Sequence, residues 1–500
     1  MENILIGLTA VLHWNYLGWI LIGTVAGIWI GAIPGLGPVM ATAVILPFTF
    51  AMEPLSALLL LASIHAAGNY GGSISAILLN VPGEATSAAT TFDGYPMARQ
   101  GKARVALGIS AASSLVGALC GVVVLATSAA PILNVALKFG PAEFFALSIL
   151  GLTVVAVVTT GSTAKGLLMG CVGLAVSFIG VDAVLGVPRF SFGSLYMQAG
   201  ISFVPVMIGL FAVSELMMLV LRGGTIAETG RLEGSLMQGV RDTFRYPAML
   251  FQSTALGIAI GAIPGVGSTA ANFMAYAVAQ KTARERGKFG EGATEGVIAP
   301  ESSNNACTSA TLIPALTLGI PGGAGSAILL VAITIHGLRP GGMLFSSSPE
   351  LVYGFFAGLF IGSVLFFIFG LLMTPWFALI TVIKVELLAP VLLVASLTGA
   401  YAYQQNLSDV FVAIFFGVVG FFARQHGYPV IGLVVGLILG KLAEQAFHQA
   451  LMLNGGDYTV FLTRPITVGT FVICLLLIAG PEISKQLKAR ISRAKTDIPE

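Results

Sequence analysis

Two nearly identical stretches rich in glycine and proline interrupt this apolar sequence, and they are its strongest candidates for ligand-binding chemistry. GAIPGLGP occupies residues 31–38, and GAIPGVGS occupies residues 261–268. Glycine lets backbone N–H groups approach a ligand closely. A helix that begins just after each stretch would also direct its positive dipole end at an anion. The two stretches therefore predict anion binding by backbone groups.

A second matched pair of interruptions follows the first pair. ILLNVPG at 77–83 is similar to LTLGIPG at 316–322. Each follows a run of small and polar residues, HAAGNYGGSIS at 65–75 and ESSNNACTSA at 301–310. One Gly-Pro motif is explained equally well as a kink that improves helix packing. Two matched sets favour a binding site, because broken helices in corresponding positions are typical of transporters.

The elements that must position these stretches are predicted to be membrane-spanning helices. The 500 residues are 56% hydrophobic and 9% charged, against roughly 25% charged in a soluble domain. Many apolar runs reach the ~20 residues that cross a bilayer, among them Val105–Thr127, Phe203–Leu221, Leu351–Met373 and Tyr428–Phe447. The sequence predicts an all-α polytopic membrane protein. The N-terminus lacks a basic region, so we expect no cleavable signal peptide.

The placement of the basic residues predicts the membrane topology. No Lys or Arg precedes Arg99, and basic clusters then occur at 99–104, 222–245, 281–288 and in the C-terminal tail. Because positive loops stay in the cytoplasm, we expect a periplasmic N-terminus and a cytoplasmic C-terminus. This topology leaves five of the 24 basic residues outside: Lys138, Arg189, Arg339, Lys441 and Arg464.

This topology gives the two GAIPG stretches opposite directions. Basic segments flank the second on both sides, so residues 248–263 and 268–280 are expected to form a re-entrant hairpin from the cytoplasm. The first has no basic flank, and its hairpin, at about 17–33 and 38–50, should enter from outside. We therefore expect two inverted-topology repeats with re-entrant hairpins and broken helices. The expected divisions are a first transmembrane repeat (1–221), a cytoplasmic linker (222–245), a second transmembrane repeat (246–480) and a basic cytoplasmic tail (481–500).

The interruptions define the candidate binding residues, because non-helical backbone at membrane depth survives only inside protein or beside a watery cavity. The predicted substrate-binding residues are Pro34, Gly35, Leu36, Gly37, Asn80, Pro82, Gly83, Pro264, Gly265, Val266, Gly267, Ser268, Thr269, Ser302, Ser303, Asn304, Asn305, Pro321, Gly322 and Gly323. Exposed carbonyl oxygens at broken helix ends suit Na⁺. The metal-ligand assignment stays open, with Na⁺ near Asn80, Thr269 and Asn304 as the candidate.

Few ionisable residues lie within the apolar runs. An intramembrane charge is a functional candidate by default, but Glu215 lies close enough to a helix end to reach the interface. Glu301 adjoins an interruption and is the better candidate, whereas His65 and His336 are more simply structural. The four cysteines, Cys120, Cys171, Cys307 and Cys474, are scattered singly and are expected to serve packing.

These motifs resemble a known family. GAIPGLGP, GAIPGVGS, ESSNNACTSATLIPALTLGIPG and the run NYGGSISAILLNVPGEATSAATTFDGYPMARQGKA (69–103) are similar to the large membrane subunit of the tripartite tricarboxylate transporters. The resemblance covers nearly the whole chain, and the family's glycine motifs match Gly31–Gly37 and Gly261–Gly267. It implies a bacterial inner-membrane symporter of di- or tricarboxylates. It also implies a small membrane subunit and a periplasmic solute-binding protein as partners.

Neutral oxygens at the interruptions favour Na⁺ as the coupling cation, while an H⁺-coupled carrier and a passive anion channel stay open. A membrane-embedded enzyme is a weaker alternative, because the sequence has no HExxH, no GxSxG and no paired intramembrane aspartates. It also has no GxxxxGK[ST] loop for ATP. We therefore expect no enzyme activity, no cofactor and no nucleic-acid partner; the expected ligands are a carboxylate and the lipid bilayer.

Overall fold

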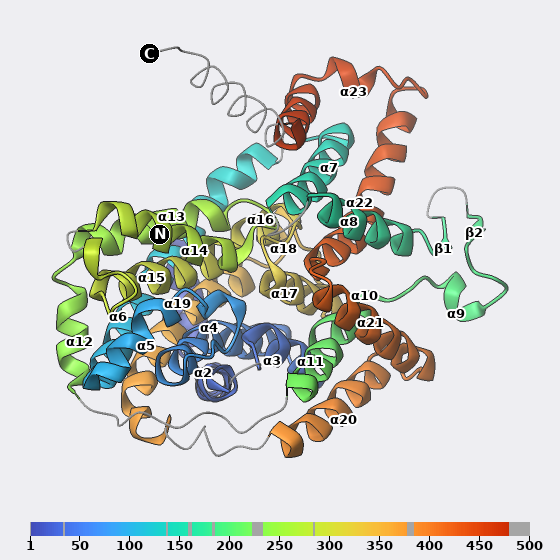
Figure 1. Ribbon diagram of the computed structural model, residues 1–500. Helices are drawn as coiled ribbons and strands as arrows, with labels where there is room; N and C mark the ends of the chain where they lie inside the picture. The colour runs from blue at the N-terminus through green and yellow to red at the C-terminus, as the bar shows by residue number, and fades with distance from the viewer. Residues whose placement is uncertain are drawn as a thin grey trace, which may run out of the picture. The chain divides into compact units, whose positions relative to one another are not determined.

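The computed structural model describes residues 2–33, 36–136, 139–158, 163–182, 186–222, 234–283, 286–377 and 385–479 (Figure 1). The chain forms two compact units, and each is discontinuous in sequence. Unit 1 comprises Met1–Ala136 and Ser202–Gly427, and unit 2 comprises Leu137–Ile201 and Tyr428–Glu500. The repeat boundaries expected from the sequence stay a prediction.

Nearly all regular structure in the described residues is helical. Six helices are long and apolar enough to cross a membrane: Trp14–Ala32, Thr91–Ser128, Phe203–Leu221, Pro349–Leu372, Leu407–Gln425 and Val430–Leu453. A helix satisfies its own backbone hydrogen bonds, which is what an apolar chain requires in lipid. The predicted all-α polytopic membrane fold is confirmed.

Unit 1 contains the four interruptions and the helices around them. Its first segment contains α1 (Glu2–Val11), α2 (Trp14–Ala32), α3 (Pro38–Ile45), η1 (Leu46–Thr49), α4 (Pro54–Leu79), η2 (Ala85–Ser87), α5 (Thr91–Met97), η3 (Ala98–Lys102) and α6 (Ala103–Ala136). Its second segment contains α10 (Phe203–Met207), η4 (Ile208–Val213), α11 (Ser214–Arg222), α12 (Leu236–Thr243), α13 (Pro247–Gly261), α14 (Gly267–Thr282), η5 (Arg286–Lys288), α15 (Thr294–Ala310), α16 (Leu312–Leu318), α17 (Ala324–Ile335), α18 (Gly342–Ser347), α19 (Pro349–Leu372), α20 (Val385–Gln404) and α21 (Leu407–Gln425).

Unit 2 is a smaller helical unit with one short hairpin. Its elements are α7 (Pro141–Val158), α8 (Thr163–Ser177), β1 (Gly180–Val181), β2 (Pro188–Arg189), α9 (Leu195–Gln198), α22 (Val430–Leu453), α23 (Val460–Thr463) and a last apolar helix over Pro465–Ala479. The two strands pair antiparallel, with Gly180 opposite Arg189. The helix α22 packs against α7 and α8.

The helices α2 and α4 pack backbone to backbone in unit 1 (Figure 1). A Cβ placed on Gly27 would lie 2.6 Å from the carbonyl oxygen of Ile64, and one on Gly31 would lie 2.2 Å from that of Gly68. Small residues one helical turn apart permit such a close approach between membrane helices. Glycine is therefore required along this face of α2.

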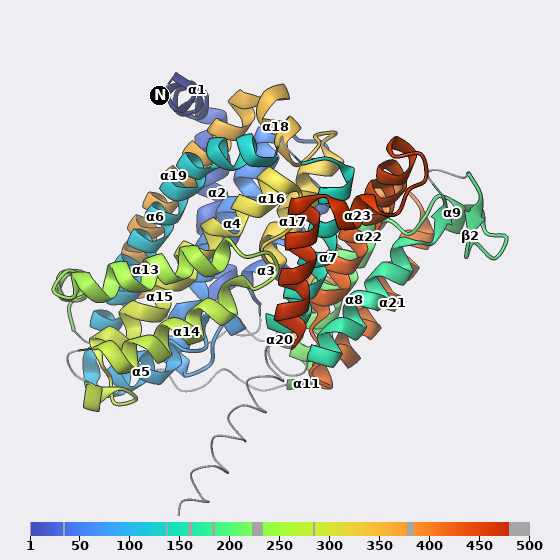
Figure 2. The ribbon, with the colours of Figure 1, turned by 90° about the horizontal axis from the view of Figure 1, so that it is seen from above.

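The helices α13 and α15 repeat this arrangement, and both views show them side by side (Figures 1 and 2). A Cβ on Gly257 would lie 2.3 Å from the carbonyl oxygen of Ser303, and one on Gly261 would lie 2.7 Å from that of Cys307. When the matched interruptions are aligned, these four residues fall on the four that join α2 to α4. The two halves that the motifs relate therefore also share the same close glycine contacts between helices.

The second pair of interruptions also has a shared geometry. Asn80 ends α4 with φ 56°, and Gly319 ends α16 with φ 73°. Both are left-handed, a conformation that glycine and asparagine adopt more readily than other residues. The two residues occupy the same place in LLNVPG and TLGIPG, so the sequence supplies a suitable residue at both helix ends.

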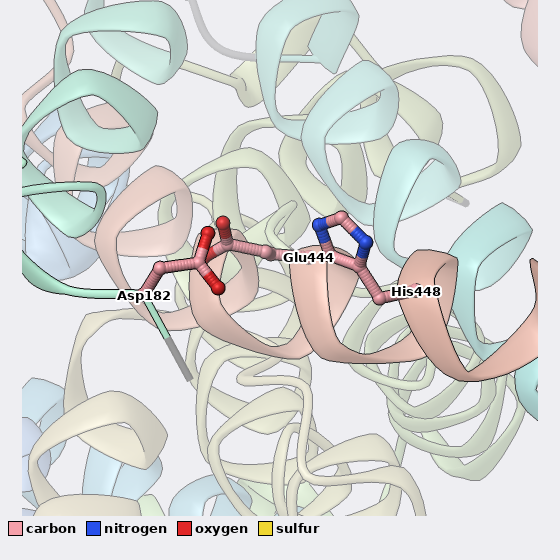
Figure 3. A group of neighbouring side chains, drawn as sticks. All are labelled: Asp182, Glu444 and His448. Carbon is pink, nitrogen blue, oxygen red and sulfur yellow. The ribbon is translucent and has the colours of Figure 1, made fainter. Parts of the chain in front are cut away.

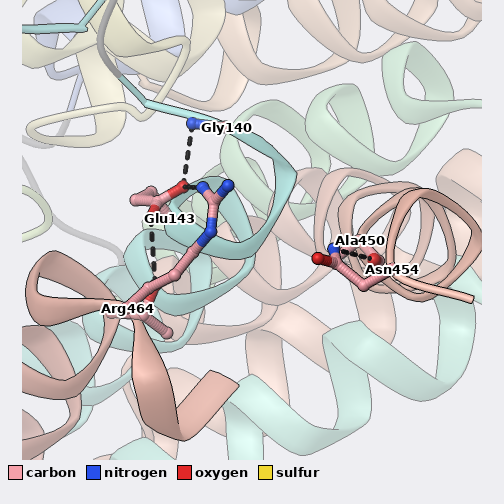
Figure 4. Close-up of polar contacts among 6 residues, drawn as sticks. Gly140, Glu143, Ala450, Asn454 and Arg464 are labelled. Atoms are coloured by element: carbon pink, nitrogen blue, oxygen red, sulfur yellow. Dashed lines mark hydrogen bonds and ion pairs between the residues drawn. The ribbon is translucent and has the colours of Figure 1, made fainter. Parts of the chain in front are cut away.

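An ion pair and side-chain hydrogen bonds link the elements of unit 2. Glu143, in the first turn of α7, accepts hydrogen bonds from the Gly140 N–H and from Arg464 Nη1, each at 2.8 Å (Figure 4). Asn454, just after α22, donates to the carbonyl oxygen of Ala450 at 2.7 Å. The salt bridge links the start of α7 to the segment after α23.

Candidate functional site

The second GAIPG stretch forms the expected helix, break and helix. The helix α13 ends at Gly261, and α14 begins at Gly267. Gly265 and Gly267 have φ of 79° and 73°, a region that costs other residues about 1–2 kcal/mol. Pro264 and Val266 are half-buried within the turn. The chain can therefore reverse direction here only because glycine occupies these positions.

The start of α17 meets this break. Gly323 caps α17, and a Cβ on it would lie 3.4 Å from the Gly267 Cα. Pro321 and Gly322 are buried just before it. The N-termini of α14 and α17 therefore lie together, and neither helix has an acidic residue in its first turn. Two positive dipole ends at one place favour an anion.

A small cavity lies beside the start of α17. Its polar lining comprises His65, Thr308, Ser309, Ser326 and Ser363, and alanine and leucine side chains complete the wall. The Thr308 hydroxyl is 3.3 Å from that of Ser268, which directly follows Gly267. This small, largely apolar cavity and the second break are therefore adjacent.

His65 of α4 brings an imidazole to this cavity. A Cβ on Gly325 would lie 2.0 Å from His65 Nε2, so the Nε2 edge of the ring contacts α17. His65 Nδ1 is buried and has no hydrogen-bond partner among the described residues. A ring nitrogen without a partner can donate to, or accept from, a polar ligand.

The first GAIPG stretch differs by one side chain. Of its predicted site residues, Pro34 and Gly35 lie outside the described residues, whereas Leu36 and Gly37 are buried. Glu84 lies against Gly37, where a Cβ would meet its Cδ at 2.9 Å. In the aligned motifs Glu84 takes the place of Gly323. The first break therefore carries its own carboxylate where the second has only glycine.

The neighbouring interruption at Pro82 and Gly83 packs onto α2 and α4. A Cβ on Gly83 would lie 2.3 Å from the Gly31 carbonyl oxygen, and Gly83 N–H donates to Gly72 at 3.1 Å. Pro82 is half-buried. Each PG motif therefore lies against the GAIPG stretch of its own half.

The polar run of α15 is buried, but its members behave differently. Ser302 and Asn305 donate to carbonyl oxygens of α15 itself, and Ser303 donates to a carbonyl oxygen of α14. Asn304 is fully buried, and neither its Oδ1 nor its Nδ2 has a partner among the described residues. Because an unpaired buried amide costs free energy, Asn304 is the member of this run that most requires a ligand.

The three residues considered for Na⁺ are in different surroundings. Asn80 is exposed at the end of α4, Thr269 is half-buried in the first turn of α14, and Asn304 is buried in α15. The contacts of the described residues do not join the three. The Na⁺ assignment stays a prediction.

Comparison with known proteins identifies the family. The model of the tripartite tricarboxylate transporter TctA family matches residues 17–435. The chain belongs to this family. It is 36% identical over 488 residues to an Agrobacterium vitis protein described as an uncharacterised 52.8 kDa protein in the TAR-I ttuC' 3'region, covering 97% of each chain. It is 35% identical to a second A. vitis protein, from the TAR-II ttuC' 3'region, over 45% of this chain and 95% of that one. No solved structure matches the chain.

Membership confirms the resemblance seen in the motifs, and it makes the chain a multi-pass membrane protein of a transporter family. Sequence reasoning missed four polar lining residues of the cavity in this TctA-family protein: Thr308, Ser309, Ser326 and Ser363. The first three lie in, or just after, the polar and PG motifs, whereas Ser363 lies on α19. For Thr308, Ser309 and Ser326, the position next to a predicted break was the sequence feature that could have identified them.

Unit 2 of the TctA-family chain contains a cluster of metal-ligand types. Asp182, Glu444 and His448 place one ligand atom each within 4.8 Å of one another (Figure 3). Arg189 Nη1, however, lies 2.5 Å from Glu444 Oε1 and 3.1 Å from Asp182 Oδ2. Hydrogen bonding to Glu444 also raises the pKa of the Arg189 guanidinium. The arginine supplies the positive charge, so the cluster fastens the β1–β2 hairpin to α22.

Proposed function

We propose that the chain is the large membrane subunit of a secondary transporter that imports an organic di- or tricarboxylate across the bacterial inner membrane. The observation that carries this proposal is the meeting of the α14 and α17 N-termini, beside a small, largely apolar cavity that hydroxyl groups and His65 also line. Backbone N–H groups and dipoles there would hold a substrate carboxylate, with His65, Thr308 and Ser326 around it.

The difference between the two breaks supports this site. In the first half Glu84 places a carboxylate against Gly37 at the start of α3. In the second half the equivalent Gly323 leaves the same position without an acid. A substrate carboxylate would complete there the electrostatic arrangement that the protein completes for itself at the first break. Binding by backbone groups, without a full positive side chain, also suits a carrier that must release its cargo.

For the coupling cation we propose Na⁺. The Thr308 and Ser268 hydroxyls lie at the second break, and the unpaired Asn304 amide lies one helical turn before Thr308 on α15; all three are neutral oxygen-bearing groups. Such oxygens suit Na⁺ better than a proton relay. H⁺ coupling is the second candidate, and the buried Glu301 carboxyl on the same helix favours it.

Two partners complete the proposed system: a small membrane subunit and a periplasmic binding protein that delivers the carboxylate. Family membership supports this arrangement. The asymmetric placement of basic residues supports a periplasmic N-terminus and a cytoplasmic C-terminus. The proposed substrate would then arrive on the side of the N-terminus.

Gly323→Ala tests the site. Gly323 has extended backbone, and the added Cβ would make only ordinary contacts, 3.4 Å to Gly267 and 3.6 Å to Thr311. The variant should therefore fold, yet the methyl group narrows the approach to the two helix N-termini. We expect uptake to fall at least about tenfold, equivalent to ~1.4 kcal/mol. The matched control is Gly18→Ala on α2, where a Cβ meets nothing within 4 Å.

The assay is uptake of radiolabelled succinate, malate and citrate into vesicles that contain both membrane subunits, with the binding protein added outside. Wild-type uptake by Gly323→Ala would remove the site assignment, and no uptake of any carboxylate by the wild type would remove the proposed function. A Na⁺ ionophore that abolishes accumulation supports Na⁺ coupling. Collapse only with a protonophore transfers the coupling to H⁺, and accumulation that never exceeds equilibrium indicates a channel.

A further inference from the structure

Glu301 is a fully buried carboxyl at the centre of a cluster of hydroxyl groups in unit 1. It lies on α15, and its partners come from the other half of the motif pattern. The Thr90 hydroxyl donates to Oε1 at 2.5 Å. The hydroxyls of Ser110 and Ser114 on α6 donate to Oε2 at 3.0 and 2.9 Å. The Ser73 hydroxyl of α4 also faces the carboxyl.

The groups that face Glu301 include no basic side chain among the described residues. The helix α6 contributes serines, the segment before α5 contributes Thr90, and α4 contributes Ser73 and Tyr70. The Tyr70 hydroxyl is buried without a hydrogen-bond partner. An ionised carboxylate without a counter-charge costs several kcal/mol when buried, even after relaxation. Glu301 therefore needs a cation, and the short oxygen–oxygen distances leave room for a proton rather than for a larger ion.

The chemistry of the donors permits both protonation states. A hydroxyl group can donate one hydrogen bond and accept two, and its hydrogen rotates freely. When Glu301 is ionised, the hydroxyls donate to it. When it is protonated, one of them, such as Thr90, can turn and accept. No side chain has to move when the proton binds or leaves.

Asp93, a second buried acid in unit 1, has a different set of hydrogen-bond donors. Its Oδ1 accepts from the backbone N–H groups of Gly290, Gly292 and Ala293 at 2.8–2.9 Å. Tyr276 donates to its Oδ2 at 2.8 Å. A backbone N–H cannot accept a hydrogen bond. Two buried acids in one unit thus have different partners: mainly backbone N–H groups at Asp93, and side-chain hydroxyls at Glu301.

We propose that Glu301 is a proton-binding site that takes up and releases a proton during the transport cycle, whether Na⁺ or H⁺ drives accumulation of the substrate. The proposal rests on the transport function proposed above. On the same helix, one turn further, Asn304 is unpaired, and one turn beyond it Thr308 contacts Ser268 at the second break. The proton site and the proposed substrate site therefore share α15. When Glu301 binds H⁺, its carboxylate becomes the neutral carboxylic acid, and loss of the proton reverses this step.

Infrared difference spectroscopy of the full chain, with its small subunit, tests the proton site without any transport. Buried carboxyls can titrate well above their usual range, so spectra are recorded from about pH 5 to 9. We expect the wild type to lose a protonated-carboxyl band as the pH rises, and Glu301→Gln to lack this band. Glu301→Asp should restore it at a shifted midpoint. A band unchanged in Glu301→Gln, or no titrating band, overturns the proposal.

Uptake measurements give the second test. Glutamine both donates and accepts hydrogen bonds, so Glu301→Gln should insert normally and resemble the protonated state. We expect its uptake to vary less than about twofold across the pH range in which wild-type uptake changes tenfold. Ser114→Ala should shift the wild-type profile, whereas Ser113→Ala, on the same helix with a hydroxyl that has no partner, should not.

The outcomes separate the two proposals. If the wild type takes up no carboxylate, the transport function fails, and the infrared titration still decides whether Glu301 binds a proton. If uptake is normal but Glu301→Gln keeps the wild-type pH profile, the proton site is wrong and the transport function stands. Equal effects of Ser113→Ala and Ser114→Ala would indicate a packing role for this face of α6 and would also overturn the proposal.

Discussion

At the scale of single residues, Asp93 shows how a distant side chain binds the turn that precedes a helix. The helix α15 begins at Thr294, and its first N–H groups have no partner within the helix. Gly290 and Gly292 take φ of 88° and 102°, which turns their N–H groups toward the Asp93 carboxylate. An acid from α5 therefore orders the turn before α15 and places a negative charge near the positive dipole end of that helix.

We predict that Asp93→Ala destabilises the protein by about 1–3 kcal/mol, because it leaves the buried Ala293 N–H and the Tyr276 hydroxyl without their acceptor. The measurement is the thermal unfolding midpoint in detergent, followed by the loss of monodisperse protein. Asp242→Ala is the control, since Asp242 pairs with the exposed Arg245 and such pairs contribute ~1 kcal/mol or less. Equal stability of Asp93→Ala and the wild type would show that the hydrogen bonds accepted by Asp93 do not stabilise the protein.

At the scale of elements, two helix pairs use the same contact. The pairs α2–α4 and α13–α15 each bring a glycine face against backbone carbonyl oxygens. The distances available to a Cβ, 2.6 Å at Gly27 and 2.3 Å at Gly257, are shorter than real Cβ contacts allow. Any larger residue must push the two helices apart. The equivalence of these contacts is independent of any assumption about the membrane.

We predict that Gly27→Ala and Gly257→Ala each destabilise the protein, by about 1–3 kcal/mol, because overpacking a close helix contact strains both partners. The loss should be similar at the two positions if the pairs are equivalent. Unfolding midpoints of the two variants, with Gly18→Ala as the neutral control, measure this. A loss of stability at one position only would show that the two helix pairs contribute unequally to the stability of the protein.

At the scale of the whole molecule, two of the basic residues that depart from the predicted topology take part in ion pairs. Arg189 lies with Asp182 and Glu444, and Arg464 lies with Glu143. The positive-inside rule counts Lys and Arg rather than net charge, so both arginines remain exceptions to the predicted orientation. Their acidic partners neutralise the charges locally without changing that count.

We predict that a cysteine at Glu53 reacts with an impermeant maleimide from the periplasm, and that one at Arg286 reacts only from the cytoplasm. The reason is the charge asymmetry of the segments around the two GAIPG stretches. The background must replace Cys171, which is exposed. Labelling of both positions from the same side would remove the inverted orientation, although the duplicated packing would remain.

The sequence by itself determined the features that depend on neighbouring residues. Apolar composition required helices, and Gly-Pro stretches required breaks. Segments 248–263 and 268–280 became α13, Pro247–Gly261, and α14, Gly267–Thr282. Asn80 and Gly319 were able to end their helices in the left-handed region. These outcomes follow from the conformational limits of each residue type, which are visible without any partner.

The tertiary structure decided which distant groups meet. It brought Gly267 to Gly323, Glu301 to Ser110 and Ser114, and Asp93 to the residues before α15. It also joined α7 and α8 to α22 in unit 2, across more than two hundred intervening residues. In an apolar chain many buried surfaces are chemically alike, so neither composition nor periodicity selects one partner among them. Close glycine contacts and buried hydrogen bonds make that selection, and both depend on the complete packing.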